Sequence, residues 1–323
     1  MDSGASRLNL AACCDVKAMK KLIKNLAGSL GYEIRRMPQQ VSIQHHGLVT
    51  PDLEGIHQQI QRSLVNQYAQ FRAQKLILYP NIRDAGFRAY SQFEEDGIIL
   101  YVLSMIGFKT RRVVEICCGS GNECMAANLI LNHGFDALLF DGNEASVAHA
   151  QTFFRTKQDC LLQPPMIKQA WITAENVNEL LTDNGYLGEV DLLSIDIDGN
   201  DYWIFKAINV IQPRLLVVET HNEIPSDKSL TVPYRTDFDY RRSPAEYFRG
   251  VSMLGMVRLC RERGYRLIGA HRHGFNAFFL RNGEGEELFP EVSVHSVHDN
   301  PNTRWSQATW WPVIKDLPWL EIP

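Results

Sequence analysis

Short apolar segments alternate with segments of helical periodicity from Arg112 to Glu219, and this alternation limits the possible folds more than any other feature of the sequence. Strands that alternate with helices of this length form parallel βαβ units. The apolar segments are continuous, as expected when helices cover both faces of a sheet. The predicted strands are residues 113–117, 137–141, 166–170, 190–196 and 214–219, and the predicted helices are residues 122–133, 145–155, 175–184 and 201–209.

The alternation stops after the strand at 214–219. The polar residues 222–243 predict a long loop, and a helix is predicted over 245–263. Residues 265–270 and 275–280 are strand-like and flank a short turn, so they must pair as an antiparallel hairpin. The predicted fold class is α/β: a Rossmann-like, doubly wound, mostly parallel seven-stranded sheet with an antiparallel C-terminal hairpin, plus N-terminal helices.

Two segments before the sheet have the apolar spacing of amphipathic helices. Residues 17–30 carry lysines on the opposite face, and such a helix can lie on an anionic membrane surface or pack on its own chain or a second subunit. Residues 53–78 are expected to cover the main domain, and residues 33–53 are interpreted as a linker. Peripheral membrane contact at the inner surface and a homo-oligomer therefore both stay open.

The chain is predicted to have three parts. Residues 1–87 form an N-terminal helical extension and linker, residues 88–281 form the main domain, and residues 282–323 form a tail of irregular pattern. The tail holds Trp305, Trp310, Trp311 and Trp319. Exposed tryptophan is uncommon, so these side chains are expected to pack on the sheet edge, a subunit interface or an acceptor.

The composition excludes several classes of function. The net charge of −4 lacks the basic excess of a nucleic-acid-binding domain, and no apolar run approaches the roughly 20 residues that cross a bilayer. The seven cysteines show no paired C-x-x-C spacing, so neither a zinc site nor a disulfide framework is predicted. Because no signal-peptide pattern follows Met1, these features predict a cytoplasmic protein that does not bind nucleic acid.

A glycine turn follows the first predicted strand of the sheet. Gly119 and Gly121 stand one residue apart before a helix-like segment, and glycine permits a sharp turn and the close approach of a ligand. About twenty residues later Asp141 ends the next strand, where nucleotide-binding α/β folds place a carboxylate that binds ribose hydroxyls. This spacing predicts a cofactor that contains a nucleoside.

Two residues at the turn bear on which nucleoside cofactor binds. Cys124 replaces the third glycine of the dinucleotide pattern G-x-G-x-x-G. Glu115, four residues before Gly119, would repel a pyrophosphate and suits a ligand with positive charge. S-adenosylmethionine has an ammonium group, a sulfonium and a ribose but no phosphate. The residues therefore favour S-adenosylmethionine, and an NAD-dependent oxidoreductase is the alternative.

Gln92 and Asp96 precede the strand that leads to the glycine turn. Because they are four residues apart, they would share one face of a helix and could reach back to the cofactor. The alternative is the ordinary chemistry of a helix start, because acidic residues favour the first turn.

These motifs together resemble those of the class I S-adenosylmethionine-dependent methyltransferases. Residues 115–121 are similar to the first motif, with Cys117 where the family has its first glycine. Residues 139–143 are similar to the second motif, whose acidic residue binds ribose. Residues 170–173 stand where adenine contacts usually lie, and residues 191–200 resemble the fourth motif.

A narrower resemblance, to the FkbM-like branch, is carried by residues 91–96, 196–201 and 218–222. The resemblance extends over about 88–281 and implies that this is the S-adenosylmethionine-binding domain. The cofactor-binding residues that it and the spacing imply are Gln92, Asp96, Glu115, Cys117, Gly119, Gly121, Asp141, Gly142, Asn143, Trp171, Ile172, Thr173 and Asp196.

The candidate catalytic residues follow the later strands. Ligands of open parallel sheets bind beyond the carboxyl ends of the strands, where Asp196 and Glu219 are expected to meet Glu115 and Asp141. His221 lies just past the strand at 214–219 and titrates near neutrality, so it is the leading candidate for the base. The alternative is a loop histidine satisfied by local hydrogen bonds.

Asp196, Asp198 and Glu219 also form a candidate Mg²⁺ site, because oxygen ligands at neighbouring strand ends suit this ion. The alternative is that Asp196 helps to seat the cofactor while Asp198 and Asp201 cap the following helix.

The predicted function is methyl transfer from S-adenosylmethionine to a hydroxyl of a small-molecule or glycan acceptor. The acceptor class follows from the resemblance alone, because FkbM-like proteins often accompany glycan or natural-product biosynthesis. The alternatives are the NAD-dependent oxidoreductase and a non-catalytic methyltransferase-fold scaffold in glycan assembly.

Overall fold

The computed structural model describes residues 32–36, 41–45 and 53–323 of the 323-residue chain. The chain divides after His57, and each part is described by itself. In the first part β1 (Tyr32–Arg36) pairs antiparallel with β2 (Val41–His45). A hairpin thus occupies part of the segment that was expected to be a linker. The helix predicted at 17–30 lies outside the described residues, and its membrane contact stays a prediction.

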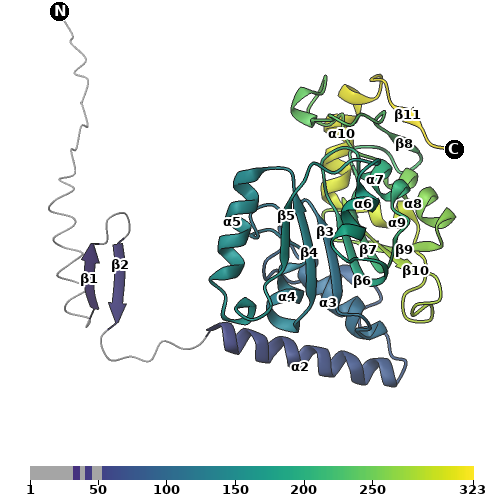
Figure 1. The fold of residues 1–323 in the computed structure, drawn as a ribbon. Coiled ribbons are helices and arrows are strands. Elements are labelled where there is room, and N and C mark those ends of the chain that lie inside the picture. Colours follow the sequence, from purple (N-terminus) through teal and green to yellow (C-terminus); the bar gives the residue numbers. More distant parts are fainter. Residues whose placement is uncertain (1–31, 37–40, 46–52) are drawn as a thin grey trace, which may run out of the picture. The chain divides into compact units, whose positions relative to one another are not determined.

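The second part is built on a seven-stranded sheet with the order β5-β4-β3-β6-β7-β10-β9. The first five strands in this order are parallel, and β10 lies antiparallel between β7 and β9 (Figure 1). This confirms the predicted α/β fold class and its C-terminal hairpin. The strands are β3 (Arg112–Ile116), β4 (Asp136–Asp141), β5 (Met166–Gln169), β6 (Gly188–Ile195), β7 (Ile211–Glu219), β9 (Tyr265–Ala270) and β10 (Asn276–Arg281).

Helices cover both faces of the sheet, which explains why its strands are apolar on both sides. The helices are α2 (Leu53–Ala73), α3 (Glu95–Ile106), α4 (Ala127–His133), α5 (Glu144–Arg155), α6 (Val177–Asp183), α7 (Asp201–Ala207) and α8 (Met253–Glu262). Short 3-10 turns lie at Ile82–Ala85, Gln158–Cys160 and Tyr240–Arg242. None of the helices in the described part of the chain is long and apolar enough to cross a membrane.

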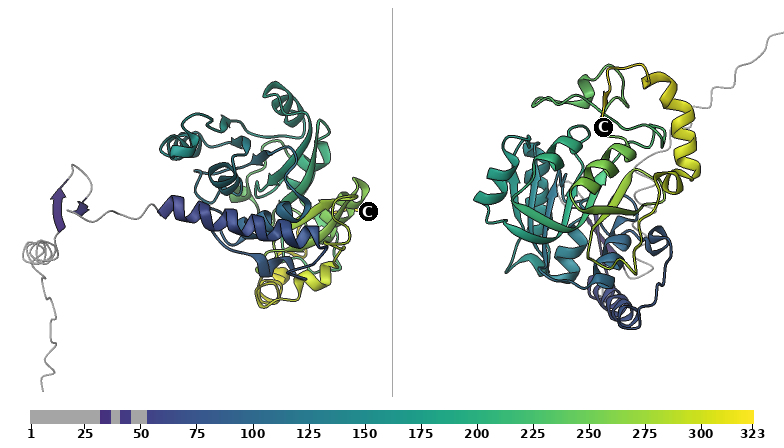
Figure 2. Two further views of the ribbon diagram at one scale, coloured as in Figure 1. Left: turned by 90° about the horizontal axis from the view of Figure 1, so that it is seen from below. Right: turned by 90° about the vertical axis from the view of Figure 1, so that its right-hand side faces the viewer.

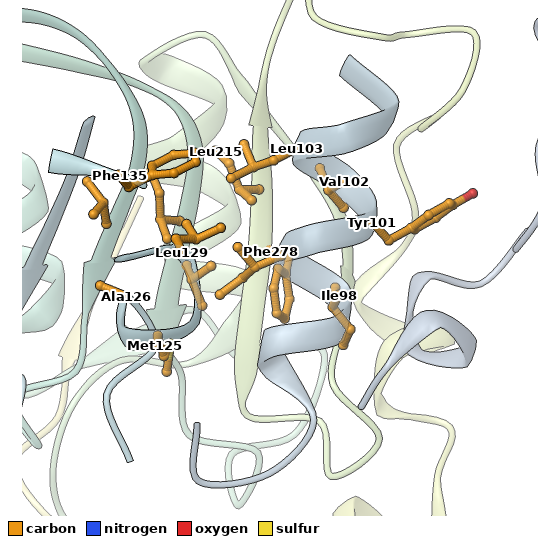
Figure 3. Close-up of a cluster of buried hydrophobic side chains, with 14 of the residues drawn as sticks. Ile98, Tyr101, Val102, Leu103, Met125, Ala126, Leu129, Phe135, Leu215 and Phe278 are labelled. Carbon is orange, nitrogen blue, oxygen red and sulfur yellow. The ribbon is translucent and has the colours of Figure 1, made fainter. Parts of the chain in front are cut away.

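The two faces of the sheet hold separate hydrophobic cores. Val113 of β3 points into one core, and its neighbour Val114 points into the other, as the two-residue period of a strand requires. The first core packs α3 and α4 on the sheet, and Figure 3 shows Leu103 and Leu129 of these helices beside Phe278 of β10. The second core packs α6, α7 and α8 on the opposite face.

Helix α4 is shorter than its pattern predicts. A helix was expected over 122–133, but α4 begins at Ala127. The backbone N–H groups of Met125 and Ala126 donate to the Glu115 carboxylate, at 2.9 and 2.7 Å, and Glu123 has a positive φ of 65°. The first predicted turn is thus replaced by a loop that the Glu115 side chain holds.

The C-terminal tail is more regular than expected. It contains α9 (Val294–His298), α10 (Pro301–Ile314) and β11 (Leu320–Glu321), and β11 pairs with β8 (Leu230–Thr231). Figure 2 shows this yellow segment beside the green segment that follows β7. The side chain of Asn300 accepts from the N–H of Thr303 and starts α10, with Pro301 in the first turn.

The tail tryptophans differ in their surroundings. Trp310 lies against Tyr247, with ring centroids 4.3 Å apart, and Trp319 lies against Phe248 at 4.6 Å. Trp305 is 59% exposed, so it is not packed within its own chain, and its packing at a subunit interface or against an acceptor stays a prediction.

Candidate active site

A cavity of about 430 Å³ opens at the carboxyl ends of the parallel strands, where the chain order reverses between β3 and β6. Its volume falls within the range of pockets for small molecules and cofactors. Its walls come from Ile116, Cys117, Gly119, Phe140, Asp141, Gly142, Asn143, Ser146, Ala170, Trp171, Ile172, Ile197, Asp198, Asn200, Phe238, Asp239, Tyr240 and Arg241.

The glycine turn forms one wall of this cavity. The N–H groups of Cys117 and Cys118 both donate to the carbonyl of Phe140, at 2.8 and 2.9 Å, which ties the turn to β4. Cys117 has a φ of +76°, a conformation that L residues rarely adopt and glycine adopts freely. Gly121 lies outside the wall, and a Cβ there would approach the Phe153 ring to 2.9 Å.

The Cys117 side chain stands beside three carboxyl groups. Burial of the sulfur atom, followed by the charges of Asp141, Asp196 and Asp198, raises the pKa of the Cys117 thiol, although the residue as a whole is exposed. The thiol is therefore protonated at neutral pH and is a poor nucleophile.

Asp141 lies at the junction of the glycine turn and β4. Its Oδ2 accepts from the N–H of Gly119 at 2.9 Å, and its Oδ1 accepts from the N–H of Asn143 at 2.8 Å. The Asn143 side chain in turn caps α5. Gly142 is required here, since a Cβ would lie 2.9 Å from the Trp171 ring. Asp141 is thus fixed on the cavity wall with lone pairs left for a ligand.

The third expected cofactor segment lies on the same wall. Ala170, Trp171 and Ile172 line the cavity, whereas the N–H of Thr173 donates to Asn176 at the start of α6, and Thr173 does not line it. The Trp171 indole is 54% exposed and donates to the carbonyl of Thr236 at 2.7 Å.

Glu115 lies behind the glycine turn and does not line the cavity. Its carboxylate accepts from the Met125 and Ala126 N–H groups and from the thiol of Cys124, 3.0 Å away. Burial raises its pKa to about 7. In this structure Glu115 organises the turn that precedes α4, and its contact with a cofactor ammonium stays a prediction.

Gln92 and Asp96 do not share a helical face, because α3 begins only at Glu95. Asp96 is buried, and its Oδ2 accepts from the N–H groups of Ala89, Tyr90 and Ser91 at 2.6–2.8 Å. Gln92 is exposed, and neither residue lines the cavity. Asp96 acts as the organiser of a helix start, which was the alternative interpretation of this motif.

The carboxylates of Asp196, Asp198 and Glu219 form a cluster, called here the carboxylate triad, whose ligand atoms all lie within 4.8 Å of one another. Burial and the nearby charges of Asp198 and Asp201 raise the pKa of Asp196 to about 8, and burial together with Asp196 raises that of Glu219 well above its usual range. Asp198, with φ +56°, also lines the cavity, so the triad borders the predicted cofactor site.

Asp201 does not face the triad as a ligand. Its two oxygens accept from the N–H groups of Ile197 and Gly199, each at 2.9 Å, and so fix the loop that carries Asp198. Neither aspartate caps α7 as the alternative expected: the helix has Asn200 at its N-cap and no side-chain capping bond, and Asp198 forms an ion pair with Arg249.

His221 is buried behind the triad. Its Nε2 lies 3.8 Å from Glu219 Oε2, and its Nδ1 lies 3.4 Å from Glu223 Oε2. Gly250 leaves the space that the ring fills, because a Cβ there would lie 2.2 Å from the imidazole. Burial alone would raise the pKa of Glu223, but His221 outweighs it and the pKa is lowered. Glu223 is therefore an anionic partner that can orient the imidazole.

Two site residues, Glu223 and Arg249, have no signal in the sequence spacing. Arg249 is 51 positions from Asp198, with no recognisable motif around it. Its place is set by tertiary pairing: the carbonyl of Gly250 accepts from Val232, and Val251 forms a bridge with Thr231.

Residues 234–242 also cover one side of the cavity. The carbonyls of Arg235 and Thr236 accept from Asn200 and Trp171, both at 2.7 Å. Phe238 lies directly over Gly199, where a Cβ would come within 2.2 Å of its ring. The long polar loop was predicted, but its contribution to the wall was not.

One segment of the chain matches the sequence model of a known protein family. Residues 166–267 match the sequence model of the methyltransferase FkbM domain. This segment is similar to the FkbM methyltransferase domain. It runs from β5 into β9 and includes the carboxylate triad, His221 and Arg249. The resemblance to class I S-adenosylmethionine-dependent methyltransferases of the FkbM-like branch is thereby confirmed. No curated protein sequence matches the chain.

Solved structures of methyltransferases are similar to this chain at low identity. The O-methyltransferase from Bacillus cereus in complex with SAH is 14% identical, with a TM-score of 0.36, over 68% of this chain and 89% of that one. An S-adenosylmethionine-dependent methyltransferase from Clostridium acetobutylicum is 11% identical, with a TM-score of 0.35, over 56% and 88%. The N-terminal domain of EvdMO1, with SAH and D-fucose, is 11% identical, with a TM-score of 0.37, over 81% and 96%.

Proposed function

We propose that this FkbM-like protein transfers a methyl group from S-adenosylmethionine to a hydroxyl of a sugar, glycolipid or natural-product acceptor. One observation carries the proposal: Asp198 belongs both to the wall of the cavity and to the carboxylate triad. A cofactor in the cavity would therefore present its methyl group beside a cluster of proton-accepting side chains.

The cavity offers groups that match S-adenosylmethionine. The Asp141 carboxylate suits the two ribose hydroxyls, and the apolar faces of Phe140 and Ile172 suit an adenine ring. The Cys117–Gly119 backbone permits close approach of the ligand chain. The cavity is acidic at Asp141 and Asp198, which favours a cationic cofactor over a pyrophosphate.

The reaction is a direct displacement. A lone pair of the acceptor oxygen forms a bond to the methyl carbon, the carbon–sulfur bond breaks, and its electron pair neutralises the sulfonium. The acceptor proton must then leave, and we propose that Glu219 accepts it as the general base. His221 is buried next to Glu219. Glu219 Oε2 and His221 Nε2 are 3.8 Å apart, which is longer than a hydrogen bond, so the two side chains must approach each other before the proton passes to His221. A carboxylate whose pKa is raised by burial is a stronger base when ionised.

The Mg²⁺ ion predicted from the sequence would have Asp196, Asp198 and Glu219 as ligands. This donor set suits a hard cation, but Asp198 is already in an ion pair with the Arg249 guanidinium. As arranged, the triad fits an organic cation better than a metal ion, and no step is derived through a metal.

Calorimetric titration tests the cofactor. SAH is expected to bind with one-to-one stoichiometry and NADH is expected not to bind; binding of NADH alone would instead favour the oxidoreductase. A methyl-labelled cofactor, offered with panels of glycans, glycolipids and small polyhydroxylated acceptors, tests the reaction. Transfer to an oxygen supports the proposal. SAH binding without transfer to any acceptor class would favour the scaffold alternative.

A further inference from the structure

We infer that the guanidinium of Arg249 is the permanent counter-ion of the carboxylate triad. Its charge keeps divalent cations out of the acceptor site. The inference concerns a residue to which the proposed function gives no role. It rests on the proposed function only in placing an acceptor beside the triad. The geometry of the triad and of Arg249 does not depend on that function.

The position of Arg249 supports this inference first. Its guanidinium pairs with Asp198, the triad member that also lines the cavity, and the side chain is only 18% exposed. Its Cζ lies 4.9 Å from the ring centroid of Tyr240 and 6.0 Å from that of Tyr247, where the negative faces of the rings favour a cation. The arginine is thus held beside the triad by contacts on more than one side.

The backbone around Arg249 is also fixed. Gly250 accepts from the Val232 N–H at 3.0 Å, and Val251 accepts from the His221 N–H at 2.8 Å. These bonds attach the arginine segment to His221, just after β7, and to Val232, just after β8. The backbone at Arg249 therefore cannot move away from the triad without disturbing the contacts of His221.

Unpartnered polar atoms mark the same place. His221 Nε2 and Arg249 Nε have no hydrogen-bond partner within the part of the chain that the structure describes, although the His221 side chain is only 3% exposed. Buried polar groups normally find partners. Both atoms are buried and neither residue lines the cavity, so the arginine and the imidazole are enclosed beside the triad.

The consequence for metals is electrostatic. A guanidinium within a few ångströms repels a divalent ion and competes for the same carboxylate oxygens. In the wild-type protein the triad is therefore expected to bind Mn²⁺, the probe for hard divalent ions, only weakly. Removal of the arginine charge should leave three clustered carboxylates, an arrangement that binds such ions.

The test measures free Mn²⁺ by electron paramagnetic resonance with full-length protein and saturating SAH. Arg249→Met is expected to bind Mn²⁺ at least about tenfold more tightly than the wild type. Arg249→Lys keeps the charge and should behave as the wild type does. Adding Asp198→Asn to Arg249→Met should abolish the gained site. Arg261→Met, which removes an exposed arginine paired with Glu291, is the matched control.

Two results would overturn the inference: wild-type protein that binds Mn²⁺ as tightly as Arg249→Met, or Arg249→Met that gains no affinity. Thermal melting checks that the variant folds, and Arg249→Gln replaces it if it does not. Calorimetry with SAH on the same samples separates the two proposals. A wild type that fails to bind SAH contradicts the proposed function, whereas the Mn²⁺ result, repeated without SAH, still decides the role of Arg249.

Discussion

The central sheet has one edge where the parallel strands begin and another where they end, and buried carboxylates are paired differently at these two edges. At the edge where the parallel strands begin, Arg214 pairs with Asp191 at 2.8 Å and with Glu284 at 2.7 Å. At the edge where they end, Asp196, Asp198 and Glu219 crowd together with Arg249 in contact with one of them. The first edge matches its buried charges, and the second concentrates charges of one sign.

The pKa values follow this difference. Hydrogen bonds from Arg214 lower the pKa of Glu284 to about 2, whereas burial and the charge of Asp198 raise that of Asp196 to about 8. Perturbed carboxyl groups that lack full compensation are a feature of functional sites. The edge where the strands begin therefore contributes to stability, and the edge where they end contributes to chemistry. Each assignment can be tested separately.

The largest effect is expected from Arg214→Met. This change leaves the carboxylate of Asp191 buried without its cation, and it should lower the free energy of unfolding by about 3–5 kcal/mol. Urea denaturation at neutral pH measures the loss, and SAH affinity of the folded variant should not change. Arg261→Met, at an exposed ion pair, should cost less than about 1 kcal/mol. Equal losses in the two variants would contradict the assignment of stability to this edge.

The next effect concerns binding at the opposite edge. Asp141→Ala removes a carboxylate that faces the cavity, and SAH affinity should fall about a hundredfold, as expected for the loss of hydrogen bonds to a charged group. Asp136→Ala, at the exposed start of the same strand, is the matched control and should bind SAH normally. Calorimetry measures both. Normal SAH binding by Asp141→Ala would remove this residue from the cofactor site.

A smaller effect is expected from pH. The folded-state pKa of Glu115 is raised to about 7, so the folded protein holds this proton more tightly than the unfolded chain does. Stability from this group is complete below the unfolded pKa of about 4.3 and is lost as pH rises through the folded pKa of about 7. Glu115→Gln should remove this dependence in unfolding measurements between pH 5 and 8.

Glu284 is the control of opposite sign. Its pKa is lowered to about 2, so its contribution is present above the unfolded pKa of about 4.3 and is lost as pH falls toward 2. Glu284→Gln should therefore be less stable than the wild type at neutral pH, and the difference should disappear in acid. A Glu115→Gln profile parallel to that of the wild type would contradict the raised pKa.

The cofactor half of the site was predictable because strand ends are encoded locally. Continuous apolar runs place Asp141, and the spacing of Gly119 places the turn, with no information from distant residues. The start of α4 was mispredicted for the converse reason, since the N–H groups of Met125 and Ala126 bond to the Glu115 side chain instead of continuing a helix.

The acceptor half depends on contacts that a local pattern does not encode. Arg249 reaches Asp198 only because the segment after β7 returns to pair with residues 230–232. The wall formed by Phe238 likewise depends on the absence of a side chain at Gly199. Such positions are fixed by tertiary packing, and only the triad and His221, which lie at or just after successive strand ends, could be predicted.

The smallest effect is expected from Cys117→Gly, which tests whether the conformation of the glycine turn limits stability and cofactor binding. Cys117 holds a φ of +76°, which costs a residue with a side chain about 1–3 kcal/mol. Glycine removes this strain but adds freedom to the unfolded chain, so Cys117→Gly should raise the free energy of unfolding by only about 1 kcal/mol. SAH affinity should be equal or higher, because the Cβ that lies beside the cavity is gone. Cys117→Ala keeps the Cβ and should match the wild type in both measurements. If Cys117→Gly weakens SAH binding, the Cys117 side chain itself contacts the cofactor, and its positive φ is not what limits cofactor binding at this turn.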